Sequence, residues 1–232
     1  TFLPKAETNL SSEISGKVVS VLVKEGTRVG AGQVVATIKK DAIEVDMSQA
    51  QNNLQNAIID NQRYENAFKT GGVTKQQLDN SRLQLKNAQA AVRAQSVRVN
   101  NAAVRAGISG TINKRMVEPG AVVSPGTPMF EIVNINTLKL SVLVDESQIS
   151  KLQIGQVVPI SVNVYPEDSY SGRITFIAPK SDASLNFPVE IEVSNNGKLK
   201  AGMYATAVFK TNNGASNQSL LTVPVEAFVN GV

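Results

Sequence analysis

The sequence predicts an elongated, modular and mainly β protein with an inserted α-helical coiled-coil hairpin. Three observations carry this prediction. A 24-residue motif occurs twice, as "SGKVVSVLVKEGTRVGAGQVVATI" (15–38) and as "SGTINKRMVEPGAVVSPGTPMFEI" (109–132), and a shift of 94 positions aligns the copies without a gap. Between the copies, from Asp41 to Arg105, the chain has no proline and, apart from Gly71 and Gly72, no glycine. After the second copy it returns to alternating, strand-like patterns.

Each copy of the motif is predicted to form a few short strands. "KVVSVLV" and "QVVATI" are rich in β-branched residues, and the segment between them contains glycines suited to turns. In the second copy, Pro119-Gly120 and Pro125-Gly126 mark two turns. One copy is too small to hold a core. We therefore expect the copies to face each other in a flattened β-sandwich with pseudo-twofold symmetry.

Residues 42–105 are predicted to form an antiparallel helical hairpin around Gly71 and Gly72. In both halves the apolar positions are spaced alternately by four and three residues, as in a coiled-coil seam. Each arm would be roughly 40 Å long at 1.5 Å per residue, and Thr74 is suited to cap the second helix. The seam positions of the first half are Ile43, Met47, Ala50, Leu54, Ala57, Asn61, Tyr64 and Phe68. Those of the second half are Leu78, Ser81, Leu85, Ala88, Val92, Gln95, Val99 and Ala102.

A second set of residues on the second helix is also spaced by seven: Leu83, Ala90, Val97 and Val104. Two interpretations stay open. The set is either scatter in an Ala-rich helix or a lateral contact between hairpins in an oligomer. The Gln and Asn residues around it suit a partly hydrated surface.

From residue 135 to about residue 212 the sequence predicts a six-stranded β-barrel. "LKLSVLVDE" alternates with period two, and Asp145 begins a short helical turn with Gln148 three residues later, as in a capping box. Further strand-like stretches are "GQVVPISVNVY", "SGRITFIAP", "FPVEIEV" and "GMYATAVFKT". Residues 1–9 and 213–232 are predicted to pair with each other in a further, truncated β domain.

Composition excludes several classes of chemistry. The chain has no Cys and no His, which removes thiol nucleophiles, Ser-His-Asp triads and most transition-metal sites. We therefore expect no catalytic site, no metal and no cofactor. The net charge is +4, but the basic residues are scattered and not clustered, so no nucleic-acid partner is expected. No apolar run approaches the roughly 20 residues of a membrane span.

A split β-sandwich with this motif resembles the lipoyl or biotinyl domain. With a helical hairpin between its halves and a barrel behind it, the chain resembles the membrane fusion proteins of the HlyD-like superfamily. These are the periplasmic adaptor subunits of tripartite efflux pumps and type I secretion systems. The resemblance implies the following division: a lipoyl-like domain (10–41 and 106–134), the hairpin (42–105), the barrel (135–212) and a membrane-proximal domain (1–9 and 213–232).

The hairpin tip sharpens this resemblance. Family members that dock TolC-like channels carry there an Arg, a Leu four residues later and a Ser eleven residues later. Here "RYENAFKTGGVT" places Arg63, Ala67 and Thr74 at these positions. Thr keeps the hydroxyl group, whereas Ala67 departs from Leu and leaves the apolar contact to Phe68. The plain alternatives are a solvated helix charge for Arg63 and an ordinary helix cap for Thr74.

The resemblance implies a periplasmic adaptor that links an inner-membrane RND transporter to an outer-membrane TolC-like channel for efflux of small molecules. It also implies self-assembly into a ring or funnel, and an N-terminal anchor in the inner membrane that lies outside this sequence. The stretch "FPVEIEVSNNGKLKAGMYATAVF" resembles the barrel end of RND adaptors. The alternative within the family is an adaptor of an ABC-type exporter or a type I secretion system.

Two readings outside the family are less favoured. A carrier domain would need its modified lysine in an exposed β-turn, but Lys39 and Lys40 stand where the hairpin begins. An enzyme would have to use carboxylates such as Asp41, Glu44 and Asp46, or Asp145 and Glu146. A solvated helix start explains the first three, because the helix dipole favours acidic residues there.

Overall fold

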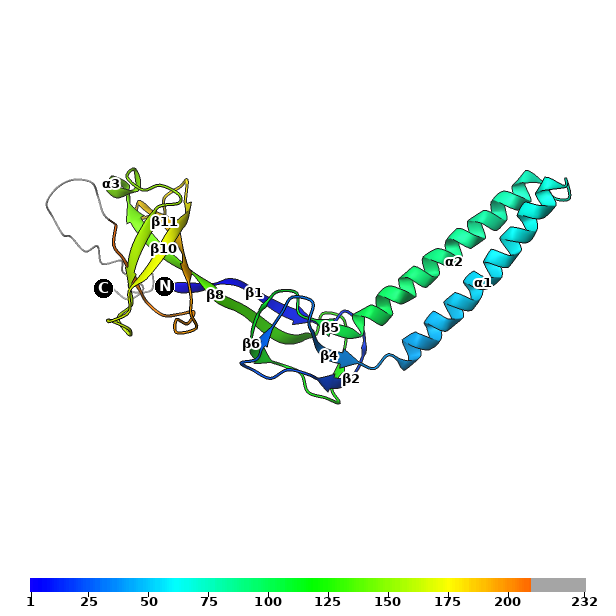
Figure 1. Ribbon diagram of the computed structural model, residues 1–232, viewed down its shortest axis with the longest axis horizontal. Helices are drawn as coiled ribbons and strands as arrows, with labels where there is room; N and C mark the ends of the chain where they lie inside the picture. Colours follow the sequence, from blue (N-terminus) through cyan, green and yellow to red (C-terminus); the bar gives the residue numbers. More distant parts are fainter. Residues whose placement is uncertain (210–232) are drawn as a thin grey trace. The chain divides into compact units, whose positions relative to one another are not determined.

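The computed structural model describes residues 1–209 (Figure 1). They form two compact units, each described here by itself. The hairpin unit comprises residues 9–107 and 112–131, and the barrel unit comprises residues 1–8, 108–111 and those from 132 onward. The strand expected within residues 213–232 lies outside the described part of the chain.

The two copies of the repeat form two four-stranded arrangements with matching order. The first has the order β5-β4-β2-β7 and the second the order β1-β8-β6-β3. Each arrangement therefore ends in a two-residue strand supplied by the other copy, β7 or β3. The bounds are β1 (Phe2–Ser11), β2 (Gly16–Val21), β3 (Arg28–Val29), β4 (Val34–Ile38), β5 (Ala103–Arg105), β6 (Gly110–Arg115), β7 (Val122–Val123) and β8 (Pro128–Asp145).

Backbone hydrogen bonds between the copies confirm the predicted pseudo-twofold symmetry. Gly26 N–H donates to the carbonyl of Ile112 at 2.8 Å, and Gly120 N–H donates to the carbonyl of Val18 at 2.8 Å. The shift of 94 positions converts one bond into the other. Gly26 and Gly120 have φ angles of +81° and +93°, which glycine adopts without strain. The bonds from Gly32 to Ala106 and from Gly126 to Ser12 are related in the same way.

Equivalent residues of the two copies also share the sandwich core. Strand alternation points one side chain in two inward, so the β-branched positions of each copy meet across the sandwich. Phe130 and Met129 are both fully buried. Buried pairs related by the shift are Val18 and Ile112, Val23 and Val117, and Val29 and Val123.

The predicted hairpin consists of α1 (Asp41–Lys69) and α2 (Lys75–Asn101). The predicted seam positions on α2 are buried or half-buried, as are those on α1 from Ile43 to Asn61. Tyr64 and Phe68, also predicted in the seam, are 37% and 41% exposed. The seam prediction is wrong for Phe68, because α2 begins only at Lys75 and the last turn of α1 has no helix opposite it.

The helical hairpin ends earlier than the predicted boundary at residue 105. Residues Ala103–Arg105 form β5, which pairs with β4, and Val104 is 6% exposed within the sandwich. Val104 therefore does not continue the outer stripe of Leu83, Ala90 and Val97. The seven-residue spacing persists in the sequence, but the backbone has become extended strand before it reaches this position.

The barrel unit contains the later part of β8, then β9 (Val157–Ser161), β10 (Tyr170–Ile177), β11 (Asn186–Ser194) and β12 (Thr206–Ala207). Their order is β12-β9-β10-β11-β8, with antiparallel pairing throughout. Inward residues of every strand meet in one core. Its fully buried members include Leu138, Leu140, Ile174, Val189, Ile191, Val193 and Leu199.

The first residues of the chain close this barrel, which corrects their predicted place in a further domain. Ser141 N–H donates to the carbonyl of Thr1 at 3.2 Å. On the other side Phe2 exchanges two hydrogen bonds with Gly202 and Met203, at 2.8 and 2.9 Å. Phe2 is fully buried in the barrel core. The start of β1 thus supplies the sixth strand among the described residues, and its predicted pairing with residues 213–232 lies outside them.

The short helix α3 (Glu146–Ile149) begins as predicted but lacks the predicted capping box. The Asp145 carboxylate caps it by accepting a hydrogen bond from Ser147 N–H at 2.8 Å. The Gln148 side chain is directed elsewhere, and within the described chain its Oε1 is buried without a hydrogen-bond partner. The Gln148 side chain therefore does not return to the start of α3. The helix itself contacts β11.

Candidate functional site

The tip of the hairpin is a tight turn closed by backbone hydrogen bonds. Thr70 N–H and Gly72 N–H donate to the carbonyl of Ala67 at 3.2 and 2.8 Å, and Gly71 N–H donates to that of Phe68 at 3.1 Å. Gly71 has a φ of +75°, the left-handed conformation in which a helix commonly ends. Because these amides satisfy the last carbonyls of α1, the turn presents side chains and no free backbone acceptor at Ala67 or Phe68.

Thr74 begins α2 as predicted and forms a complete capping box. Its Oγ1 accepts a hydrogen bond from Gln77 N–H at 3.2 Å, while the Gln77 Oε1 accepts from Thr74 N–H at 2.8 Å. The Thr74 hydroxyl lies 3.2 Å from the same Oε1 and donates to it. The hydroxyl expected to contact a partner is therefore engaged within the turn, so a partner would have to compete with Gln77 for its proton.

Arg63, Phe68 and Thr74 are the exposed members of the predicted docking set. The Arg63 side chain is 76% exposed and forms an ion pair with Asp60 at 3.3 Å. An exposed pair of this kind contributes little to stability, which leaves the guanidinium available to a partner. Phe68 is 41% exposed in the last turn of α1, whereas Ala67 is half-buried. The structure thus places the exposed apolar surface of the tip on Phe68.

The sequence analysis missed a buried hydrogen bond between the two helices. Asn61 and Ser81 are 7% and 4% exposed, and the Ser81 hydroxyl lies 3.1 Å from Asn61 Oδ1 and 2.8 Å from the carbonyl of Leu78. Both residues were predicted in the seam, one on each helix, and that shared location was the available signal. A polar pair inside an apolar seam favours one axial register of the two helices over others.

Two ion pairs across the seam are consistent with that axial register of the helices. Glu65 pairs with Arg82 at 3.5 Å, and Asp46 pairs with Arg98 at 3.6 Å. All four side chains are at least 41% exposed, so the pairs add little stability. Their value here is that they connect the helices at two further levels.

The lysines weighed for a carrier role have acidic partners in the structure. At the hairpin root Lys39 pairs with Asp41 at 3.4 Å and Lys40 pairs with Glu44 at 2.7 Å. The hydrogen bond to Glu44 raises the pKa of Lys40 above its ordinary value of 10.5. Lys40 immediately precedes α1 and does not lie in a β-turn. These pairings account for the root lysines without a carrier role.

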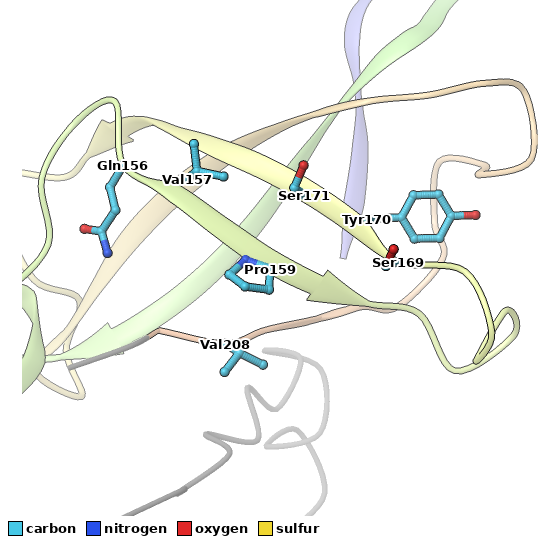
Figure 2. A pocket seen from close by; sticks show the side chains of 7 residues that line it. All are labelled: Gln156, Val157, Pro159, Ser169, Tyr170, Ser171 and Val208. Carbon is cyan, nitrogen blue, oxygen red and sulfur yellow. The ribbon is translucent and has the colours of Figure 1, made fainter. Parts of the chain in front are cut away.

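Surface hollows of the described chain include one of about 720 Å³ at the hairpin root, lined in part by the paired charges Asp46 and Arg98. A second, of about 550 Å³, lies on the barrel beside Asp168 and Asn195. A third, of about 320 Å³, also lies on the barrel, where β9 and β10 contribute most of the lining (Figure 2). Its residues are Gln156, Val157, Pro159, Ser169, Tyr170, Ser171 and Val208. Among the described residues, no group of three or more His, Cys, Asp or Glu side chains could hold a metal ion.

A network of three polar side chains borders the barrel hollows, and Tyr170 lines both of them. The Lys198 ammonium lies 2.7 Å from Asp168, and the Tyr170 hydroxyl donates to the same carboxylate at 3.1 Å. These hydrogen bonds, with that from Lys198 the stronger influence, lower the pKa of Asp168 below 3.8. The carboxylate therefore stays charged and holds the loop that carries it against Lys198.

In the described part of the chain, no helix is both long and apolar enough to cross a membrane.

Two family models match the chain. The RND MFP barrel-sandwich hybrid domain, where MFP denotes membrane fusion protein, matches residues 6–135, which is more than half of the chain. The CusB-like β-barrel domain matches residues 138–213. The nodulation protein NolF of Rhizobium meliloti is 29% identical over 217 residues, covering 87% of this chain and 59% of the relative. The multidrug resistance protein MdtA of Proteus mirabilis is 28% identical over 159 residues, covering 62% of this chain and 39% of the relative.

Solved structures share the fold. A MacA-MexA chimera that contains the α-hairpin domain of Pseudomonas aeruginosa MexA has a TM-score of 0.75 at 23% identity, covering 88% of this chain and 76% of that one. The membrane fusion protein Spr0693 of Streptococcus pneumoniae has a TM-score of 0.71 at 21% identity, covering 91% of this chain and 97% of that one. This chain spans about half the length of the curated relatives it matches. The sandwich model, which by itself covers more than half of the chain, and the barrel model after it show that the chain belongs to the membrane fusion proteins, the periplasmic adaptor family of efflux pumps.

Proposed function

We propose that this chain is the adaptor that links an inner-membrane RND transporter to an outer-membrane TolC-like channel for efflux of small molecules. It acts in the periplasm of a Gram-negative envelope, held to the inner membrane by an N-terminal element, and several copies form a ring or funnel. Substrate passes through the sealed conduit, and the chain binds and positions its partners without catalysing a reaction.

The observation that carries the proposal is the hairpin tip. The carbonyls of Ala67 and Phe68 are bonded within the turn, and the exposed Phe68 ring and Arg63 guanidinium are the groups there that we expect a partner to bind. An apolar ring suits a groove between helix ends. A guanidinium suits carbonyl or carboxylate groups on the rim of a partner. Thr74 contributes by shaping the turn through its capping box.

The RND assignment within the family is supported by both domain models. The sandwich model is described as RND MFP, and the barrel model as CusB-like. The name of the relative MdtA speaks of multidrug resistance, which suits small-molecule efflux. The alternative is that the chain serves an ABC-type exporter or a type I secretion system. The experiments below distinguish this alternative from an RND transporter.

Photocrosslinking from the hairpin tip tests the proposal. A photoreactive residue replaces Phe68 in the full-length protein in its own cells, with a second variant at Thr74. A control places it at Val122, which is 79% exposed in the sandwich. We expect capture of an outer-membrane channel subunit from the tip positions and not from Val122. Capture of only a transporter, or of only further copies of the chain, would show that the tip does not dock a channel.

Efflux assays test the guanidinium separately. Arg63→Ala should raise the drug sensitivity of the cells, because it removes the charge at the tip while leaving a helix-favouring residue. Arg28→Ala removes an equal charge from an exposed position on β3 and serves as the matched control. Equal sensitivity of the two variants would contradict a docking role for Arg63. The class of the transporter follows from whether efflux stops on dissipation of the proton gradient or only on depletion of ATP.

A further inference from the structure

Phe68 has the spacing of a buried residue but is exposed. In the sequence it continues the seam of α1, four residues beyond Tyr64. In the structure it is 41% exposed, because the last turn of α1 has no helix opposite it. Positions where the local pattern and the folded chain disagree are commonly functional. Some feature of the hairpin therefore keeps this ring out of the seam.

The axial register of the two helices decides whether Phe68 is covered. The hydrogen bond between Asn61 and Ser81 sets these two residues level. Because the helices are antiparallel and rise equally per residue, Phe68 lies level with Thr74, each seven residues closer to the tip. Thr74 is the N-cap of α2, so the seam of α2 begins only beyond this level.

A register displaced by one heptad would cover the ring. If α2 moves seven residues toward the tip relative to α1, a shift of about 10 Å, Phe68 lies level with Ser81 inside the seam. The displacement preserves the heptad spacing, so seam residues still face seam residues. Burial of an aromatic ring is favourable, so the displaced register gains free energy at this position.

The sizes of the apolar seam residues do not distinguish the two registers. In the native register Ala57 lies level with Leu85, and Ala50 lies level with Val92. In the displaced register Ala57 would lie level with Val92, and Ala50 with Val99. A small residue thus faces a large apolar residue at these positions in both registers.

Asn61 and Ser81 do distinguish the registers. They are 7% and 4% exposed, and the Ser81 hydroxyl lies 3.1 Å from Asn61 Oδ1. In the displaced register Asn61 would lie level with Ala88, and Ser81 with Phe68. The Ser81 hydroxyl would keep the Leu78 carbonyl, which lies 2.8 Å away, but the Asn61 amide would lose its partner. A buried polar group without a partner is costly, which favours the native register.

We propose that the Asn61–Ser81 hydrogen bond is a positioning contact that holds the hairpin in the register that leaves Phe68 exposed for a partner. The inference rests on the proposed function, in which Phe68 docks a channel, and it assigns these two buried residues a role in docking. Gly71 and Gly72 act in the same direction, because the displaced register would extend α1 over them, and glycine disfavours a helix.

Two substitutions remove the polar pair without opening the seam. Asn61→Leu with Ser81→Ala reproduces the pairing of Leu54 with Ala88, one heptad closer to the root. Replacing both partners by apolar groups should leave the resistance of the helices to denaturant equal or higher. Photocrosslinking from Thr74 in the full-length protein should nevertheless capture severalfold less channel than it does with the polar pair in place.

A tryptophan reports the exposure of position 68, since the chain has no Trp of its own. The full-length protein carries Phe68→Trp, once with the polar pair and once with Asn61→Leu and Ser81→Ala. The emission of Trp moves to shorter wavelengths when its ring leaves water. We expect this shift in the apolar variant and not in the protein that keeps the polar pair.

Cysteine pairs report the register directly, since the chain also has no Cys. Ala57→Cys with Leu85→Cys joins positions that are level in the native register. Ala57→Cys with Val92→Cys joins positions that are level only after the displacement and otherwise lie about 10 Å apart along the axis, beyond the reach of a disulfide. With the polar pair in place only the first disulfide should form within a chain. In the apolar variant the second should form as well.

Exchange of the two polar residues provides the rescue. Asn61→Ser with Ser81→Asn keeps an amide and a hydroxyl at one level and should restore the native cysteine pairing, the exposed Trp and the capture of a channel. A purely structural role would instead appear as lost resistance to denaturant in the apolar variant. That loss would overturn the proposal. An apolar variant that keeps only the native cysteine pairing and an exposed Trp would overturn it too, since the turn alone would then set the register.

The cysteine and Trp measurements need no channel, so this inference and the proposed function fail separately. A parent protein that captures no channel rejects docking by the tip, while the cysteine pairs still decide whether Asn61 and Ser81 set the register. Undiminished capture by an apolar variant with a displaced register keeps the adaptor function and rejects the requirement for an exposed Phe68.

Discussion

The repeat sandwich and the hairpin belong to one compact unit but are stabilised in different ways. In the sandwich, two layers exchange strands and enclose side chains completely, so that Ile112 is 1% exposed and Phe130 is fully buried. In the hairpin, two helices meet along a single seam, and half of the sixteen seam residues are only half-buried. A two-helix hairpin cannot enclose a core, so its stability and its register depend on a few positions.

The same difference leaves the hairpin with more surface for partners. The sandwich turns its apolar residues inward on both layers, whereas each helix of the hairpin has only one neighbour and keeps the rest of its circumference exposed. Phe68 at the tip, Val45 and Ile59 on α1, and Leu83 and Val97 on α2 lie on that exposed surface. The part of the unit that contributes least to its core therefore carries the surface proposed for docking.

The largest expected effect is in the sandwich core. Phe130→Ala should lower the free energy of unfolding by about 3–5 kcal/mol, because it leaves a cavity that two enclosing layers cannot close. Denaturant unfolding measures this loss. Val122→Ala, at a position 79% exposed, should change it by less than about 0.5 kcal/mol. A loss for Phe130→Ala as small as that of the control would show that the sandwich is not the better enclosed region.

A truncation in the hairpin seam should have a smaller and more local effect. Leu78 is 4% exposed, and Leu78→Ala should reduce stability by about 2 kcal/mol, the lower end of the range for buried Leu, because the open seam can partly collapse. Hydrogen exchange should speed up for amides of α1 and α2 while those of β4 and β6 keep their protection. Equal acceleration in the strands would contradict the independence of the hairpin.

Loss of the helix cap at the tip is expected to have a smaller effect again. Thr74→Ala removes the acceptor for Gln77 N–H and should reduce the stability of the hairpin by about 1 kcal/mol. Thr74→Ser keeps the hydroxyl and should fall within a few tenths of a kcal/mol of the parent. Hydrogen exchange at the first amides of α2 measures both variants. If the two variants behave alike, the capping box contributes nothing at this site.

The smallest effect is expected from surface charge on the barrel, where solvent screens the Asp168–Lys198 pair. The pKa of Asp168 is lowered, so its contribution to stability is present above the unfolded value of about 3.8 and is lost as the pH falls through the folded value. The pKa of Lys198 is raised, so the pair also loses its contribution as the pH rises above about 10.5. Asp168→Asn should therefore lie slightly below the parent in melting temperature between these limits and converge with it at both extremes. Parallel curves over the whole range would exclude this role.

Local patterns in the sequence were sufficient to predict the helices and the repeated strands of the fold. The spacing of four and three residues predicted both helices and most of the seam, because helical geometry alone determines which side chains share a face. The shift that aligns Gly26 with Gly120 predicted the symmetric sandwich, because equal sequences adopt equal turns. Thr74 was predicted as a helix cap for the same local reason. At the tip, Arg63 and Phe68 were predicted as docking residues, whereas the bond that commits the Thr74 hydroxyl to Gln77 was not predicted.

Long-range pairing was decided only in the tertiary structure. Phe2 was expected outside the barrel, yet it closes the barrel between β8 and the segment at Gly202 and Met203, a contact that no local pattern encodes. Val104 has the spacing of the outer stripe on α2 but lies in β5, because pairing with β4 ends the helix before it. The hydrogen bond between Asn61 and Ser81 sets the height of one helix against the other. A sequence pattern states which side of an element is apolar, but only the packed chain determines what that side meets and at which level.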